Sequence, residues 1–125
     1  MSIQKLFFAL ISLTILLFII SCAKSATISS SSQYDNFAKC LADKGVKMYG
    51  AYWCPHCANQ KTMFGDSFQY VNYIECSLPN RAGQTQVCRD ANIQSYPTWE
   101  FADGTRVTGE QVIESLSLKS GCNPE

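Results

Sequence analysis

Two cysteines separated by two residues, in the run YWCPHCANQK at residues 52–61, constrain this chain more than any other feature. The β-prone run VKMYGAY (46–52) precedes them and good helix formers follow, so Cys54 falls at a predicted helix start. Free backbone N–H groups and the dipole at a helix N-terminus stabilise a thiolate. Pro55 suits the first helical turn, because it has no N–H to lose. Cys57 lies one turn further on, where it can resolve a mixed disulfide on Cys54.

The residues around the pair refine this redox interpretation. His56, the only histidine of the chain, adds a hydrogen-bond donor or a positive charge, and Trp53 forms an apolar wall beside the cysteines. A zinc site is an alternative, but it needs two further ligands, and Cys76 and Cys88 do not form a second close pair. An inert structural disulfide is another alternative, although so short a loop gains little chain entropy from closure. We therefore predict a redox pair and no metal.

Length, charge and cysteine content narrow the function classes. The 125 residues suffice for one small domain. Ten basic and ten acidic side chains cancel, and no Lys/Arg block occurs, so nucleic acid is not an expected partner. Seven cysteines favour an oxidising compartment over the cytosol.

The N-terminus indicates export. Lys5 precedes an apolar stretch at 6–20, which has the length of a signal-peptide core and is short for a membrane span, although an uncleaved anchor remains the alternative. We therefore predict a signal peptide over 1–21. The run IISC resembles a bacterial lipobox, in which Cys22 would be lipidated; ordinary cleavage after Ala23 is the alternative.

A Ser-rich tether over 22–32 and one folded domain over 33–125 are expected after this leader. Hydrophobic periodicity and turn signals predict the following elements: a helix ending near Gly45, a strand in 46–52, a helix after CPHC, a buried strand at 71–76, a short helix at 85–93, a hairpin around Asp103–Gly104 and a last helix stopping at Gly121. Thr108 and Gln111 match a capping box for that last helix. This order predicts an α/β fold, a mixed β-sheet with helices on both faces.

The run MYGAYWCPHCANQKTMFG, followed by YVNYIECS, Cys88 and IQSYPTW, resembles the thioredoxin-like domain attached to bacterial homologues of vitamin K epoxide reductase (VKOR). Protein disulfide isomerase and DsbA are more distantly similar. The resemblance covers about residues 33–120 and implies a thioredoxin-like fold. It further implies that Pro97 is a cis-proline facing the active site, and that Tyr96 lines the surface where an extended substrate docks, beside Trp53.

The same resemblance gives the other cysteines roles. Cys76 and Cys88 match positions that form a second, structural disulfide in related domains, with an electron relay as the alternative role. Cys40 and Cys122 remain; a disulfide between them would clamp the two ends of the domain, but the sequence does not fix their distance.

Two departures from the family pattern bear on mechanism. The membrane helices of the reductase portion are absent, so we expect a stand-alone domain whose membrane partner, of the VKOR or DsbB type, is a separate protein. Met48 occupies the position where thioredoxins carry a buried carboxylate that helps deprotonate the second cysteine. Deprotonation of Cys57 is then left to water or to a group brought near by folding.

The predicted function is that of an extracytoplasmic thiol-disulfide oxidoreductase that exchanges disulfides with exported proteins. Pro-His between the cysteines is the pair found in DsbA, so an oxidase acting on exported proteins is expected, in the periplasm and anchored by lipid. A reductase or isomerase fed by a membrane donor is the main alternative, and a redox-inactive module that binds extended chains is another. No cofactor is implied.

Overall fold

The computed structural model describes Ile3 and residues 32–125. The predicted signal peptide, apart from Ile3, lies outside these residues, and so do Cys22 and the tether up to residue 31. Within the described part of the chain, no helix is both long and apolar enough to cross a membrane.

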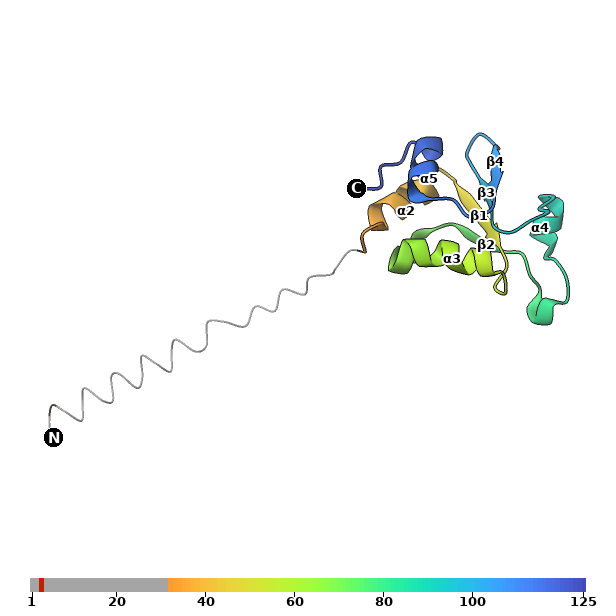
Figure 1. The fold of residues 1–125 in the computed structure, drawn as a ribbon, viewed down its shortest axis with the longest axis horizontal. Coiled ribbons are helices and arrows are strands. Elements are labelled where there is room, and N and C mark those ends of the chain that lie inside the picture. The colour runs from red at the N-terminus through yellow and green to blue at the C-terminus, as the bar shows by residue number, and fades with distance from the viewer. Residues whose placement is uncertain (1–2, 4–31) are drawn as a thin grey trace. The chain divides into compact units, whose positions relative to one another are not determined.

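The described part folds around a four-stranded sheet of order β2-β1-β3-β4 (Figure 1). Strand β1 pairs with β2 in parallel and with β3 in antiparallel orientation, and β3 pairs antiparallel with β4. The elements follow in the order α2 (Asp35–Asp43), β1 (Lys47–Gly50), α3 (Pro55–Phe64), η2 (Gly65–Tyr70), β2 (Tyr73–Glu75), η3 (Pro79–Arg81), α4 (Gln86–Asp90), β3 (Thr98–Glu100), β4 (Arg106–Thr108) and α5 (Ile113–Ser120), where η marks a 3₁₀ helix.

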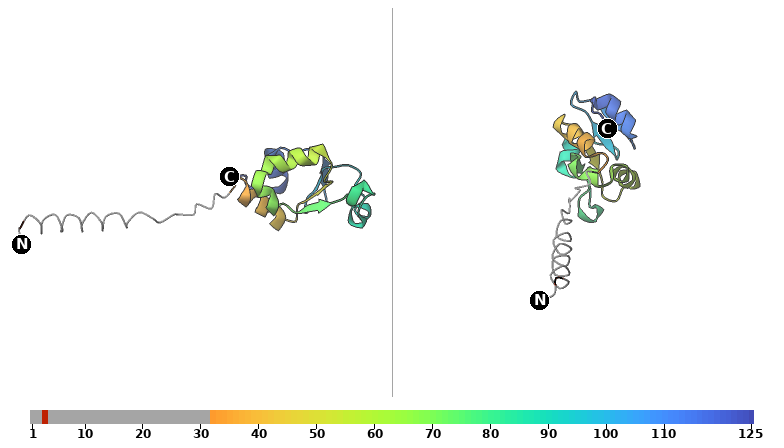
Figure 2. Two further views of the ribbon diagram at one scale, coloured as in Figure 1. Left: turned by 90° about the horizontal axis from the view of Figure 1, so that it is seen from below. Right: turned by 90° about the vertical axis from the view of Figure 1, so that its left-hand side faces the viewer.

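Side chains on the two faces of this sheet belong to two separate apolar clusters. Met48 of β1 lies in the larger cluster, to which α2, α3 and α5 contribute, whereas its neighbour Tyr49 lies in a smaller cluster with Cys88 of α4. Successive strand residues point to opposite faces, so helices cover both faces. Figures 1 and 2 show α4 on the far side of the strands from α2, α3 and α5. The predicted α/β class is confirmed, and the arrangement is compatible with a thioredoxin-like fold.

Stacked aromatic rings join the helices to the sheet in the larger cluster. Phe37 of α2 stacks on Phe64 of α3 with ring centroids 6.0 Å apart, and Phe64 stacks on Trp99 of β3 at 6.1 Å. Phe37, Ala38 and Leu41 are buried, as their helical spacing predicts. This packing fixes α3, and with it the CPHC motif at its start, against the sheet.

Two predicted elements differ from the structure. The strand expected at 71–76 is β2, an edge strand of intermediate burial, because only β1 pairs with it. The predicted capping box was wrong: α5 begins at Ile113, and its N-cap is Val112, which makes no side-chain capping bond. The buried side chain of Gln60 holds the backbone of Gln111 instead, so the helix begins after that residue.

Candidate active site

The CPHC motif begins α3, and Cys54 is the N-cap of that helix. Its backbone is extended (φ −79°, ψ 120°), and its Sγ accepts a hydrogen bond from the N–H of Cys57 at 3.4 Å. Pro55 follows at the first helical position, where its missing N–H is no loss. The Cys54 sulfur therefore occupies the place of a capping oxygen, where negative charge is stabilised by the helix N-terminus.

Among the six cysteines that the structure describes, Cys54 and Cys57 carry free thiols. Both are nearly inaccessible, with exposed fractions of 5% for Cys54 and 1% for Cys57. Burial raises the pKa of the Cys57 thiol to about 12, although a hydrogen bond with the Ala51 backbone and the charge of Lys61 act in the opposite direction. The two thiols thus lie in different environments one helical turn apart.

The Tyr96–Pro97 peptide bond is cis, and it lies directly beside the cysteines. The Cys54 thiol donates to the carbonyl oxygen of Tyr96, with sulfur and oxygen 3.6 Å apart. The ring of Trp53 meets that of Tyr96 edge-on, with centroids 6.1 Å apart. Trp53 is 40% exposed, so the structure brings Trp53, Tyr96 and Pro97 to the reactive sulfur and leaves an aromatic surface open to a ligand.

His56 points its Nδ1 at a carboxylate that the sequence did not indicate. Nδ1 lies 2.6 Å from Oε1 of Glu110, and the Asn59 amide donates to the same oxygen at 3.1 Å. The hydrogen bond with His56, and then that with Asn59, lower the pKa of Glu110. No hydrogen bond links His56 to Cys54 or Cys57 in the part of the chain that the structure describes, so the predicted tuning by His56 would act through charge.

The last residue of β2 and the segment that follows it hold the loop that carries Trp53, and sequence patterns did not reveal these contacts. The Tyr52 N–H donates to Glu75 Oε1 at 3.2 Å, and the Trp53 indole N–H donates to Ser77 Oγ at 2.8 Å. The Arg81 N–H donates to the Tyr52 hydroxyl at 3.1 Å. These bonds join residues more than 20 positions apart in the chain, so no local motif signals them.

Cys76 lies inside this segment, between Glu75 and Ser77, and forms a disulfide with Cys88 of α4. The other disulfide joins Cys40 of α2 to Cys122, just past α5. Neither disulfide involves Cys54 or Cys57, so both of these thiols are free for thiol-disulfide exchange.

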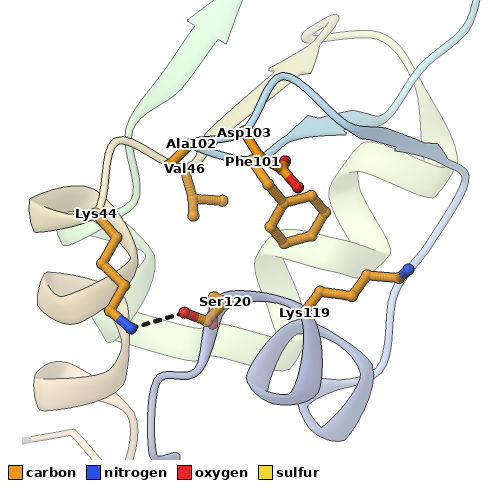
Figure 3. Close-up of a pocket in the computed structure, with 7 residues that line it drawn as sticks. All are labelled: Lys44, Val46, Phe101, Ala102, Asp103, Lys119 and Ser120. Atoms are coloured by element: carbon orange, nitrogen blue, oxygen red, sulfur yellow. Dashed lines mark hydrogen bonds between the residues drawn. The ribbon is translucent and has the colours of Figure 1, made fainter.

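A pocket of about 200 Å³ lies elsewhere, near the turn between β3 and β4 (Figure 3). In Figure 3 Lys44 reaches across to the backbone of Ser120, which accepts its hydrogen bond at 2.7 Å. No residue of the CPHC motif lines this pocket. No cluster of three or more His, Cys, Asp or Glu side chains suited to a metal ion occurs in the described residues.

Comparison with known proteins points to the same chemistry. No protein-family model matches the chain. The thiol-disulfide oxidoreductase LTO1 of Arabidopsis thaliana is 41% identical to it over 98 residues, which represent 74% of this chain and 26% of the Arabidopsis protein. The chain thus spans about a quarter of the length of the curated relative that it matches.

Proposed function

We propose that this chain is an extracytoplasmic thiol-disulfide oxidoreductase in which Cys54 is the nucleophile and Cys57 the resolving cysteine. The observation that carries the proposal is the free thiol pair at the start of α3, with Cys54 as N-cap and in contact with the Tyr96 carbonyl. The similarity to the Arabidopsis oxidoreductase supports the same activity.

The proposed reaction follows from the placement of the two sulfurs. A client thiolate attacks Cys54 Sγ of the oxidised pair, the Cys54–Cys57 bond breaks, and the electron pair leaves with Cys57 as a thiolate that takes up a proton. A second client thiolate attacks the client sulfur of the mixed disulfide and releases Cys54. The client loses two electrons and gains a disulfide, and the cysteine pair is reduced.

The proposed direction is oxidation of exported proteins. The helix start stabilises a Cys54 thiolate, and stabilising the reduced form makes a disulfide more oxidising. Reoxidation would then require a separate membrane protein of the VKOR or DsbB type, and lipidation of Cys22 would keep the domain beside it. Trp53 and Tyr96 would contact the client chain, since they border the sulfur on its open side.

Replacing Cys54 tests this function. The full chain carrying Cys22→Ser, purified in detergent and oxidised, is incubated with a reduced, unfolded secreted protein, and the loss of client thiols is followed. We expect Cys54→Ser to abolish thiol loss, because no sulfur is left for the client to attack. The matched control is Cys40→Ser/Cys122→Ser, which removes a remote disulfide and should retain the activity.

A Cys54→Ser variant that still oxidises the client would refute the assignment. If neither the parent chain nor the variant oxidises the unfolded client, but the variant still binds the client, the domain is a binding module instead.

A further inference from the structure

Cys57 has to lose a proton whenever it attacks a disulfide, yet it lies in apolar surroundings. It is 1% exposed, and the position that a carboxylate takes in thioredoxins is filled here by Met48, which is fully buried. A thiol so enclosed needs a proton acceptor brought to it by the fold, since general bases must lie within hydrogen-bond reach or one water away.

The structure places the hydroxyl of Tyr73 beside this thiol. Both groups lie against Gly50 of β1: a Cβ atom at Gly50 would lie 3.0 Å from Cys57 Sγ and 3.2 Å from the Tyr73 hydroxyl oxygen. It would also lie 2.7 Å from Cε2 of the Tyr73 ring, closer than real Cβ contacts. The thiol and the hydroxyl therefore both border the small space that glycine leaves open at this position.

The Tyr73 hydroxyl in turn donates to Glu75 Oε2 at 2.8 Å. The other oxygen of Glu75 accepts the N–H groups of Tyr52 at 3.2 Å and Ser77 at 2.8 Å. Three donors thus fix the carboxylate, and one oxygen is directed to Tyr73 alone. Burial, and then the hydrogen bond to Glu75, raise the pKa of the Tyr73 hydroxyl, so it is a neutral donor.

The remaining charged group at this place favours a thiolate on Cys57. Lys61 lies one turn after Cys57 on α3, with Nζ 3.9 Å from the centroid of the Tyr73 ring, and its charge lowers the pKa of Cys57. The groups that face the thiol are therefore Cys54 at the helix start, Lys61 on α3, and Tyr73 on β2 with Glu75 behind it. His56 is paired with Glu110 instead.

We propose that Glu75, acting through the Tyr73 hydroxyl, accepts the proton of Cys57 when Cys57 resolves a mixed disulfide on Cys54. This inference rests on the proposed function of the cysteine pair. Glu75 would then be the proton acceptor for Cys57 that the sequence did not reveal, since Met48 stands where thioredoxins carry a carboxylate.

The step balances in protons and electrons. Tyr73 takes the proton of Cys57 and passes its own proton to Glu75 Oε2. The Cys57 thiolate attacks Cys54 Sγ, the bond from Cys54 to the partner sulfur breaks, and the electron pair leaves on that sulfur. The cysteine pair loses two electrons to the partner. In the opposite direction, protonated Glu75 returns a proton through Tyr73 as Cys57 leaves.

A purely structural role for Glu75 is the competing explanation, because Glu75 also anchors the active-site loop at Tyr52. Glu75→Gln separates the two roles: the amide oxygen still accepts the N–H groups of Tyr52 and Ser77, but the side chain no longer takes up a proton. Tyr73→Phe keeps the ring and removes only the hydroxyl. Tyr70→Phe is the matched control, since Tyr70 is also half-buried under a lysine, Lys39.

The test uses the full chain with Cys22→Ser, reduced in detergent and mixed with excess glutathione disulfide. Samples are quenched with acid, and mass spectrometry counts chains that carry one glutathione. Attack by Cys54 forms this mixed disulfide, and attack by Cys57 removes it.

In Glu75→Gln and Tyr73→Phe we expect mixed-disulfide formation at the parent rate and its resolution slowed about 10²-fold at neutral pH. The double variant should be no slower than either single one, because both residues act in one path. The defect should disappear at alkaline pH, where hydroxide deprotonates Cys57. The Tyr70→Phe variant should match the parent.

Resolution at the parent rate in Glu75→Gln would overturn the proposal, and so would an equal slowing at every pH, which a displaced loop produces. Failure of the proposed function looks different: the parent chain would then form no mixed disulfide at Cys54.

Discussion

Cys54 and Cys57 are chemically identical side chains within one helical turn, and only their surroundings can give them different roles. Cys54 caps α3 and contacts the Tyr96 carbonyl, whereas Cys57 is enclosed, and burial raises the pKa of its thiol. A nucleophilic sulfur needs stabilised negative charge, which the start of a helix provides, and a resolving thiol needs to stay protonated until the mixed disulfide forms. The two environments match these two demands.

At this scale the sequence predicts the reactive sulfurs but not the residues that support them. The cysteine spacing and the Tyr96-Pro97 run are local patterns, so they are readable from the chain alone. Glu75 and Glu110 contact the motif from 23 and 54 positions away, as measured from their partners Tyr52 and His56. Only the folded sheet brings such residues together.

At the scale of elements, one buried glutamine decides where α5 begins. Gln60 on α3 is fully buried; its Nε2 donates to the Gln111 carbonyl at 2.9 Å, and its Oε1 accepts the Gln111 N–H at 2.7 Å. The indole N–H of Trp99 also donates to Oε1, at 3.3 Å. These bonds satisfy polar groups that would otherwise be buried unpaired, and they join α3 to β3 and to the segment before α5.

Gln60→Met is expected to lower the free energy of unfolding by about 3 kcal/mol, because it keeps the volume but leaves the backbone of Gln111 and the indole of Trp99 without partners. Urea denaturation measures the loss. Gln94→Met, at an exposed position, is the control and should change stability by less than about 0.5 kcal/mol. An equal effect in the two variants would contradict this account of α5.

Elements that local patterns determine agree with the sequence-based predictions, whereas the start of α5, which a tertiary contact determines, does not. The stripe of Phe37, Ala38 and Leu41 is strictly helical, and α2 was expected there. The turn at Asp103–Gly104 indicated the hairpin of β3 and β4, which the structure confirms. The start of α5 was wrong, because a tertiary contact from Gln60 overrides the local capping pattern.

At the scale of the whole molecule, the two disulfides have different roles: one joins the ends of the domain, and the other supports the candidate active site. Cys40–Cys122 joins the two ends of the domain, 82 positions apart. Cys76–Cys88 spans 12 positions and joins the segment that holds Trp53 to α4. The sequence alone did not fix these pairings, because six cysteines permit 15 connectivities.

Removal of the Cys40–Cys122 disulfide should lower the stability of the domain without changing its thiol chemistry. We expect Cys40→Ser/Cys122→Ser to lower the free energy of unfolding by about 4 kcal/mol, since a long loop regains much of its entropy in the unfolded chain. The reactivity of Cys54 towards glutathione disulfide should stay unchanged. Urea denaturation and the rate of mixed-disulfide formation measure the two quantities. A large loss of Cys54 reactivity in a folded variant would contradict the division of roles.

The central claim is that Cys54 and Cys57 form an oxidising redox pair, and their reduction potential tests it most directly. The full chain with Cys22→Ser is equilibrated with glutathione buffers, and the oxidised fraction of the pair is measured. We predict a potential well above the value of about −270 mV typical of thioredoxin, towards the value of about −120 mV for DsbA. A potential near or below that of thioredoxin would contradict the oxidase, and a pair that never equilibrates with glutathione would contradict the redox site itself.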